Sequence, residues 1–390
     1  MQHAMSRRAL LRSTGVAAAA GVALGGVGTA AAGATTPLDA PERGDGRRHR
    51  TRLVLLGTAG GPSVYPDRSG IASAVAVEDA VYLVDCGHSV QTRFVQAGLA
   101  TPTRPGNRAF EGLQAIFLTH LHSDHTVEYP AFRITGMWNG LDNPARPVQV
   151  HGPGDRGGVP PVFGSAPPPP VVNPQDPTPG TVKMTAYLDQ AYATGLNDRL
   201  RSSGGADPRR VFQVHDIALP ASVPVPVDTN PMPPVAPFAI FEDARVRVTA
   251  TLVNHAPVFP SFAFRFDTDD GSITFSGDTA PSENLIQLAQ GTDVLVHEAI
   301  DRAWVEGLFP PPRTPATEAL VEHLLESHTT IQDLGQVAER AHAKMTVLSH
   351  IVPVTNPESR WLEAQRGYSG KLLVGRDLMQ IGVGTKKRAA

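Results

Sequence analysis

The chain has 390 residues, of which 41% are apolar and 18% are charged, and its formal net charge is −3 at pH 7. This composition suits a globular core and excludes a largely disordered chain. Lysine and arginine are scattered along the sequence, so no basic face indicates binding to nucleic acid through its phosphates. The single cysteine, Cys86, excludes an internal disulfide and a zinc site built from thiolates.

The N-terminal segment has the pattern of an export signal. Residues 6–15, SRRALLRSTG, carry a twin-arginine pair, an apolar run follows over 16–27, and TAAAGA supplies small residues for cleavage. The alternative is a disordered basic start followed by an alanine-rich helix. We predict a twin-arginine signal peptide over 1–34 and a polar linker over 35–50, which places the protein in the periplasm or outside the cell. The apolar run is too short and too rich in glycine for a membrane anchor.

Short β-rich runs open the next part of the chain. Residues 51–57, TRLVLLG, predict a strand that ends in glycines, and 73–87 predict two strands around a turn. Residues 113–119, LQAIFLT, predict a buried strand that leads into a cluster of histidines. Asp124 is placed to cap a helix that continues through HTVEYPAFRITGMW.

The composition changes from about residue 143 to 237, where prolines are clustered. This segment predicts an insertion with long loops and one helical segment, TAYLDQAYATGLNDRLR. Regular elements then resume. Strands are predicted at 245–255, 262–278, 293–299 and 345–350, and helices near 315–327 and 331–343. Strands that alternate with helices in this way predict a layered α/β protein, with one domain over residues 51–390.

Potential metal ligands gather where the predicted strands end. The first cluster, FLTHLHSDHT, contains His120, His122, Asp124 and His125. The later strand ends supply His255, Asp278, His297, Glu298 and His350. Because binding sites of layered α/β proteins usually lie at such ends, the repetition favours one shared site over unrelated structural histidines.

The spacing in the first cluster suits two cations. His120 and His122 point to the same side of an extended segment, whereas Asp124 and His125 lie a helical turn further on. Two cations roughly 3.5–4 Å apart can share a water or hydroxide, and Asp278 would suit a bridging carboxylate. Imidazole and carboxylate ligands without thiolate favour a pair of Zn²⁺ ions, with iron and manganese as alternatives.

Several motifs, in this order, resemble those of the metallo-β-lactamase-fold hydrolases, in the branch shared by ribonuclease Z and the zinc-dependent arylsulfatases. The motifs are LGTAGGP, LVDCG with Asp85, THLHSDH, NHAP, SGDT, VHEA and LSHIVP. The resemblance runs from about residue 52 to 380 and omits most of the proline-rich insertion. It implies an αββα sandwich.

The resemblance also implies roles for individual residues. One metal would be held by His120, His122 and His255, the other by Asp124, His125 and His350, and Asp278 would bridge them. A hydroxide between the metals would attack the substrate, with Asp124 helping to orient it. His297 would stabilise the developing charge or protonate the leaving oxygen. His328, which precedes a plausible helix cap at Thr330, is interpreted as structural, with a role in the pocket as the alternative.

The substrate is the least determined feature. Between residues 141 and 240 there are seven Lys or Arg and eight Asp, a balance that does not favour a tRNA-binding arm. We therefore predict an exported dinuclear zinc hydrolase, arylsulfatase-like or phosphodiesterase-like, that cleaves small sulfate esters or phosphodiesters. A lactonase or other carboxyl-ester or amide hydrolase is the alternative on the same fold, and a di-iron redox enzyme or a metal-binding module is the alternative from other classes. The expected partner is a small-molecule ester and not a nucleic acid, and relatives suggest a homodimer.

Overall fold

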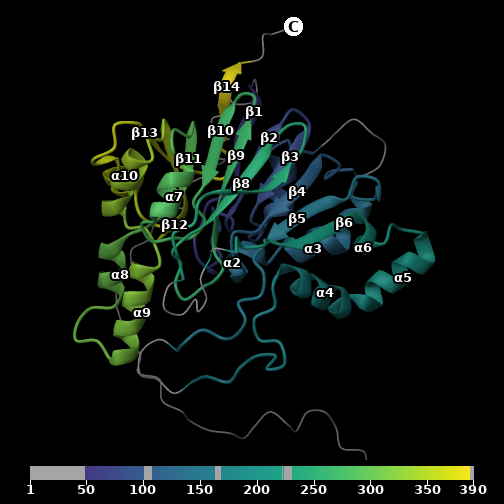
Figure 1. Ribbon diagram of the computed structural model, residues 1–390, viewed down its shortest axis with the longest axis horizontal. Helices are drawn as coiled ribbons and strands as arrows, with labels where there is room; N and C mark the ends of the chain where they lie inside the picture. Colours follow the sequence, from purple (N-terminus) through teal and green to yellow (C-terminus); the bar gives the residue numbers. More distant parts are fainter. Residues whose placement is uncertain (1–48, 101–107, 163–167, 222, 224–230, 387–390) are drawn as a thin grey trace, which may run out of the picture. The chain divides into compact units, whose positions relative to one another are not determined.

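Two β-sheets form the framework of the protein (Figure 1), and the computed structural model describes residues 49–100, 108–162, 168–221, 223 and 231–386. These residues fall in one compact unit. Within them the first sheet has the strand order β14 (Gln380–Lys386), β1 (His49–Gly57), β2 (Ala72–Val77), β3 (Ala80–Val84), β4 (Leu113–Phe117), β5 (Val148–Gly152) and β6 (Phe212–Asp216). The second sheet has the order β13 (Lys371–Val374), β12 (Met345–Val352), β11 (Val294–Ile300), β10 (Gly271–Phe275), β9 (Phe262–Thr268), β8 (Arg247–Leu252) and β7 (Phe238–Glu242).

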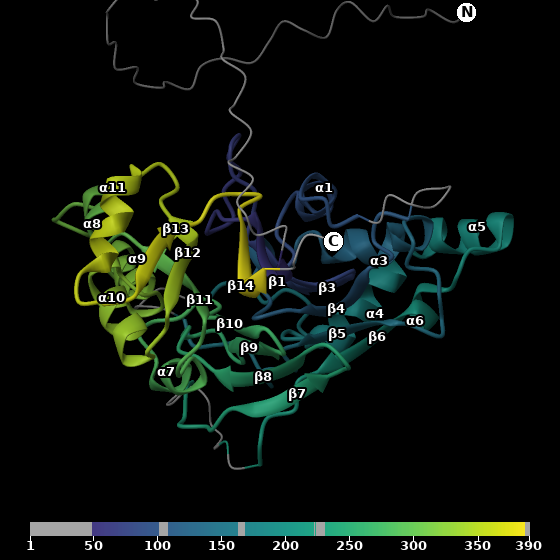
Figure 2. The same ribbon diagram turned by 90° about the horizontal axis from the view of Figure 1, so that it is seen from above.

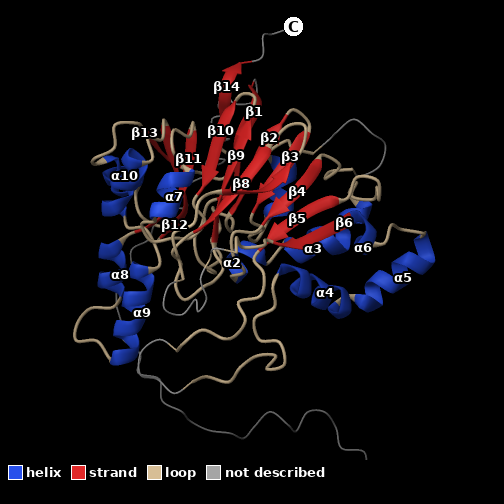
Figure 3. Ribbon diagram, viewed as in Figure 1, coloured by secondary structure: helices blue, strands red, loops and turns tan. Residues whose placement is uncertain are grey.

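Most helices lie on the outer sides of the two sheets, as Figures 2 and 3 show, whereas α2 (Ser123–Thr126) lies near the middle, where the sheets meet. In the first half of the chain the helices are α1 (Val90–Gln96), α2, α3 (Tyr129–Thr135), the 3₁₀ turn η2 (Gly136–Trp138), α4 (Thr181–Ala191), α5 (Ala193–Ser203) and α6 (Pro208–Val211). In the second half they are α7 (Glu283–Leu288), α8 (Arg302–Leu308), α9 (Pro315–Glu326), α10 (Ile331–Arg340), α11 (Glu358–Trp361) and the 3₁₀ turn η3 (Leu362–Gln365). None of the helices in the described residues has the length and apolar character needed to cross a membrane.

The central strands of the two sheets bury both of their faces, whereas the edge strands β6 and β7 are partly exposed. In β1, Leu53 and Leu55 enter the core between the sheets, whereas Val54 and Leu56 enter the core under the helices of the first sheet. Successive side chains of a strand point to opposite faces, so a strand covered on both sides has a continuous apolar run. The predicted αββα sandwich is confirmed by these four layers.

Some predicted boundaries differ from the structure. Strands β5 and β6 belong to the first sheet although they lie within the segment predicted as an insertion, and the helical segment there is divided into α4 and α5 at Tyr192. Asp124 does not cap a helix: it lies inside α2, and a new helix, α3, begins at Tyr129. Pro130 explains the break, because a residue without a backbone N–H is tolerated in the first turn of a helix but not in its interior. The predicted signal peptide and linker lie before the described residues, apart from the last two linker positions, which start β1.

His151 on β5 is a buried histidine outside the metal-ligand cluster. Its ring stacks on Phe117, with the ring centroids 5.4 Å apart, and on His215, with the centroids 4.7 Å apart. Burial, and then the neighbouring His215, lower the pKa of His151 to about 4. Because the same side chain has a pKa near 6.5 in an unfolded chain, the folded state accepts its proton much later than the unfolded state as the pH falls.

We expect His151 to reduce the stability of the protein between about pH 6.5 and pH 4. Above this window the ring is neutral in both states, and within it only the unfolded state gains the proton. At pH 5 the loss should be about 2 kcal/mol relative to pH 7. The variant His151→Phe should lack this loss, which urea unfolding of both proteins at pH 7 and pH 5 will measure. An equal pH dependence in the two proteins would contradict the assignment.

Candidate metal centre

The predicted ligands arrive at one place from four strands. His120 and His122 follow β4, His255 follows β8, Asp278 follows β10, and His350 lies within β12. The two sheets meet here, because the N–H of Phe262 at the start of β9 donates to the carbonyl oxygen of Thr119, at 2.9 Å. The ends of β4, β8 and β10 and the strand β12 therefore lie close together, and they bring together residues that are far apart in the sequence.

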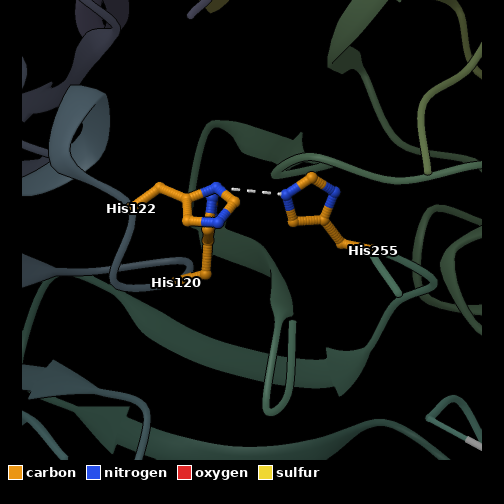
Figure 4. Close-up of side chains that lie close together, drawn as sticks. All are labelled: His120, His122 and His255. Atoms are coloured by element: carbon orange, nitrogen blue, oxygen red, sulfur yellow. Dashed lines mark hydrogen bonds between the residues drawn. The ribbon is translucent and has the colours of Figure 1, made fainter. Parts of the chain in front are cut away.

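Three histidines form the first group of donors. One ring nitrogen from each of His120, His122 and His255 lies within 4.8 Å of the others. Figure 4 shows His122 and His255 facing each other, and the distance between Nδ1 of His122 and Nε2 of His255 is 3.4 Å. His120 and His255 are buried and His122 is exposed. This group can hold one cation and leaves it accessible from the side of His122.

Asp124, His125 and His350 form the second group. Nε2 of His350 lies 3.4 Å from Oδ2 of Asp124, and Nε2 of His125 lies 3.6 Å from the same oxygen. All three side chains are buried. The group offers two imidazoles and a carboxylate to a second cation, as the sequence predicts.

Asp278 lies between the two groups. Its Oδ1 is 3.3 Å from Nε2 of His125, and its Oδ2 is 3.2 Å from Nε2 of His350. The same Oδ2 is 3.9 Å from Nε2 of both His120 and His255. One carboxylate thus faces donors of both groups. The structure brings all seven predicted ligands together in the arrangement expected of a bridged pair of cations.

The hydrogen bonding of the centre fits bound cations. Nε2 of His120, Nε2 of His125 and Oδ1 of Asp278 are buried but have no hydrogen-bond partner. Buried polar atoms without partners are costly and rare, so three in one cluster indicate that another species satisfies them. The donors are nitrogen and oxygen atoms, which fit Zn²⁺.

The electrostatics of the centre favour positive charge. Burial alone would raise the pKa of Asp278, but His350 and His125 hold it well below its usual value. Burial alone would lower the pKa of His125, but Asp278 and Asp85 raise it well above its usual value. Asp278 and Asp85 favour the positively charged form of His125, and the anionic carboxylate of Asp278 can attract metal cations in the same way.

Two further features hold the ligands in position. Oδ2 of Asp85 accepts a hydrogen bond from Nδ1 of His125 at 2.8 Å, and the N–H of Thr119 donates to Oδ1 of Asp85 at 2.8 Å. Such an outer carboxylate fixes the ring orientation of a ligating histidine. In the glycine loop after β1, a side chain at Gly60 would place its Cβ 2.6 Å from Nδ1 of His350. Glycine is therefore required where this loop approaches the centre.

His297 does not face the accessible side of the centre, where the sequence-based role would put it. It is fully buried, its Nδ1 lies 2.8 Å from the carbonyl oxygen of Glu298, and its Nε2 has no hydrogen-bond partner. It lines a cavity of about 30 Å³ together with Asp85, Thr119 and Asp278. Burial lowers the pKa of His297 to about 4. A neutral ring behind the ligands is not placed to contact a substrate or to protonate a leaving group.

A different pair, Glu298 and His328, reaches the centre. Nδ1 of His328 lies 2.9 Å and 3.0 Å from the two carboxylate oxygens of Glu298. The ring centroid of His328 is 5.0 Å from that of His255 and 6.0 Å from that of His350. Burial would lower the pKa of His328, but Glu298 raises it to about 9. The interpretation of His328 as structural therefore needs correction, because its ring adjoins both groups of ligands.

The protein resembles known families along most of its length. Residues 204–351 match the model of the Beta-lactamase superfamily domain. The chain is 28% identical over 334 residues to a protein named Ribonuclease Z from Mycobacterium bovis (strain BCG / Pasteur 1173P2), an alignment that covers 85% of this chain and 98% of that protein. It is 29% identical to a Ribonuclease Z from Mycobacterium sp. (strain KMS), with 85% of this chain and 95% of that protein covered.

Solved structures show the same fold. Human tRNase Z, short form, has a TM-score of 0.53 and 20% identity, with 86% of this chain and 100% of that chain covered. A long form RNase Z from yeast also has a TM-score of 0.53, with 13% identity and 88% of this chain and 43% of that chain covered. The predicted resemblance to the metallo-β-lactamase superfamily, in its ribonuclease Z branch, is confirmed. The two groups of donors fit the predicted cofactor, a pair of Zn²⁺ ions.

These relatives overturn the predicted function and partner. The prediction of a small-ester hydrolase without a nucleic-acid partner is wrong. The relatives that align over 95–98% of their own length are named Ribonuclease Z. The description as an arylsulfatase-like protein is wrong for the same reason, and the lactonase alternative is set aside with it. The signal peptide over residues 1–34 stays a prediction, because these residues lie outside the described part of the chain. The charge count over residues 141–240 misled the prediction, since a pair of divalent cations attracts a phosphodiester without a basic insertion. The cellular location itself stays a prediction, because it depends on residues before position 49.

Proposed function

We propose that this metallo-β-lactamase-fold chain, a metal-dependent hydrolase of the ribonuclease Z branch, hydrolyses phosphodiester bonds of RNA. The observation that carries the proposal is His328, held by Glu298 beside a donor set for two metals that Asp278 joins. Relatives named Ribonuclease Z, aligned along 85% of this chain, support RNA as the substrate.

The zinc pair would be held by the seven side chains of the two donor groups and Asp278. When bound, it supplies Lewis acidity toward a phosphoryl oxygen and lowers the pKa of a coordinated water. Each group of donors would hold one cation, and the carboxylate of Asp278 faces both groups. Asp124 lies 3.4 Å from His350 and is anionic, because His350 and His125 lower its pKa despite burial. It is placed to accept a hydrogen bond from the attacking water.

Protonation of the leaving oxygen falls to His328. Glu298 accepts a hydrogen bond from Nδ1 of the ring, so Nε2 is the nitrogen that would donate to the substrate. In the reaction a water oxygen forms a bond to phosphorus, the bond from phosphorus to the ribose oxygen breaks, and the proton on Nε2 passes to that oxygen. A ribose alkoxide is a poor leaving group, so a positioned acid contributes about 10²–10⁴-fold to the rate. Glu298 is a positioning residue that favours the protonated ring.

The proposal is tested with a folded RNA that carries a single-stranded 3′ extension. The zinc-loaded protein should cut this RNA at a defined site, a chelator should abolish the activity, and added Zn²⁺ should restore it. Hydrolysis of 4-nitrophenyl sulfate under the same conditions should be negligible by comparison. Failure to cut any RNA while two zinc ions are bound would contradict the proposed function.

A further inference from the structure

A cavity of about 540 Å³ opens beside the metal centre and is not explained by the chemistry of phosphodiester cleavage. We propose that it binds one unpaired nucleobase of the RNA strand, next to the phosphate that is cut. This inference rests on the proposed function and adds a substrate feature, namely a base that the enzyme reads in a pocket. His122, which belongs to the first group of metal ligands, also lines the cavity. A base bound there therefore belongs to a nucleotide at the cleavage site.

The walls of the cavity are flat and apolar. Pro153, Pro177 and Pro179 come from the segment between β5 and α4, whereas Pro257, Phe259 and Pro260 come from the loop that follows His255. Proline rings have fixed backbone dihedrals, so these walls lose little conformational freedom when a ligand binds. Flat apolar surfaces and an aromatic ring suit the face of a base, which stacks on such side chains in proteins that bind single-stranded RNA.

The charges of the side chains that line the cavity also favour a single base over a phosphate-rich stem. The ionisable residues among the described side chains that line the cavity are His122, Arg156 and His323, and none of these lining residues is acidic. The guanidinium of Arg156 donates to the carbonyl oxygen of Gly158 at 2.9 Å, which holds it at the wall. One guanidinium suits the carbonyl edge of a single base or its adjacent phosphate. A phosphate-rich stem would need a row of cations.

The size of the cavity suits an unpaired base. A base within a helical stem is stacked and hydrogen-bonded, so it is not available to a pocket, whereas an unpaired base can be turned out and bound. The cavity volume falls within the range of ordinary small-ligand pockets. The proposal therefore requires that the nucleotide on one side of the cut be single-stranded.

The first part of the test uses the wild-type enzyme. Each nucleotide within three positions of the cut is replaced in turn by an abasic nucleotide, and kcat/KM is measured for each RNA. An abasic nucleotide at one position should lower kcat/KM by about tenfold or more. Cleavage that is insensitive to abasic substitution at every position would overturn the inference but leave the proposed function intact. Absence of any RNA cleavage would overturn both.

The second part assigns the effect to this cavity. Val258 lies between Pro257 and Phe259 and lines the pocket, so Val258→Trp should fill it. The ratio of kcat/KM for the intact RNA to kcat/KM for the abasic RNA should fall from about ten toward one. Val182→Trp on α4 is the matched control, because Val182 is exposed and is not among the lining residues; its ratio should stay near ten. Zinc content and circular dichroism verify that both variants are folded. An unchanged ratio in folded Val258→Trp would place the base elsewhere.

Discussion

Replacing Asp278 by asparagine should remove at least one of the two zinc ions and lower RNA cleavage on the order of 10³-fold, which corresponds to about 4 kcal/mol of activation free energy. The amide keeps the size of the side chain but loses its negative charge. Asp278 has oxygens 3.2 Å from His350 and 3.3 Å from His125 and faces donors of both groups, so no other residue can take over its bridging position. Zinc is counted by elemental analysis of the dialysed protein, and cleavage is measured with saturating RNA.

Asp293→Asn is the matched control for this change. Asp293 is also a hydrogen-bonded carboxylate, accepting from the N–H of Ser272 at 2.8 Å, but it immediately precedes β11 and pairs with Lys344. We expect this variant to bind two zinc ions and to cleave RNA at nearly the wild-type rate. If Asp278→Asn retains both zinc ions and more than a tenth of the activity, Asp278 does not bridge the metals.

The second large effect is expected from His328→Ala. Loss of the proton donor should lower kcat on RNA by about 10²–10⁴-fold while two zinc ions remain bound. The same variant should hydrolyse bis(4-nitrophenyl) phosphate at close to the wild-type rate, because 4-nitrophenolate leaves without a proton. The comparison of the two substrates separates proton donation from damage to the centre. An equal loss on both substrates would show that His328 supports the site structurally.

Glu298→Gln extends this test to the pH profile. Glu298 raises the pKa of His328, and the ring must be protonated to act as an acid. Activity should therefore decline on the alkaline side as His328 loses its proton. With glutamine the hydrogen bond remains but the charge is lost, so the alkaline limb of kcat should move to lower pH. A profile that does not move would contradict the role of Glu298 as the positioning residue.

The metal ligands could be predicted from the sequence because most of them lie in short motifs at strand ends. THLHSDH contains four of the seven ligands, and the preceding apolar run indicates a buried strand that delivers them. The later ligands, such as Asp278 in SGDT, follow equally clear strands. The local sequence therefore predicted each strand and the ligand at its end. The resemblance predicted which ligands would hold which of the two cations.

The catalytic pair was less accessible to sequence reasoning. His297 and Glu298 are neighbours on β11, but the pairing of β11 with β12 shifts register between His297 and Ala299, so the alternation of a regular strand does not apply there. The resemblance assigned the catalytic role to His297, whereas Glu298 was predicted only as a potential ligand at the strand end. His328 precedes α10, and its partner Glu298 lies 30 positions away. Only the packing of α10 on the second sheet brings them together.

The short strands β5 and β6 were missed because proline-rich loops surround them, and their pairing with each other and with β4 defines them better than their five residues do. A nucleic-acid partner was ruled out at the level of the sequence because charge was counted along a segment. Whether RNA is bound depends on where charges and metal ions lie in space, and the cations of the centre are absent from any count of Lys and Arg.

Cleavage of the RNA in water enriched in ¹⁸O tests the central claim most directly, because that claim is hydrolysis of an RNA phosphodiester by an activated water at this centre. Mass spectrometry of the products should find one ¹⁸O in the new terminal phosphate, a free hydroxyl on the other fragment, and the same outcome when the nucleotide at the cut lacks its 2′-hydroxyl. A 2′,3′-cyclic phosphate without ¹⁸O, or no cleavage of the 2′-deoxy substrate, would contradict the account, because the RNA's own hydroxyl would then be the nucleophile.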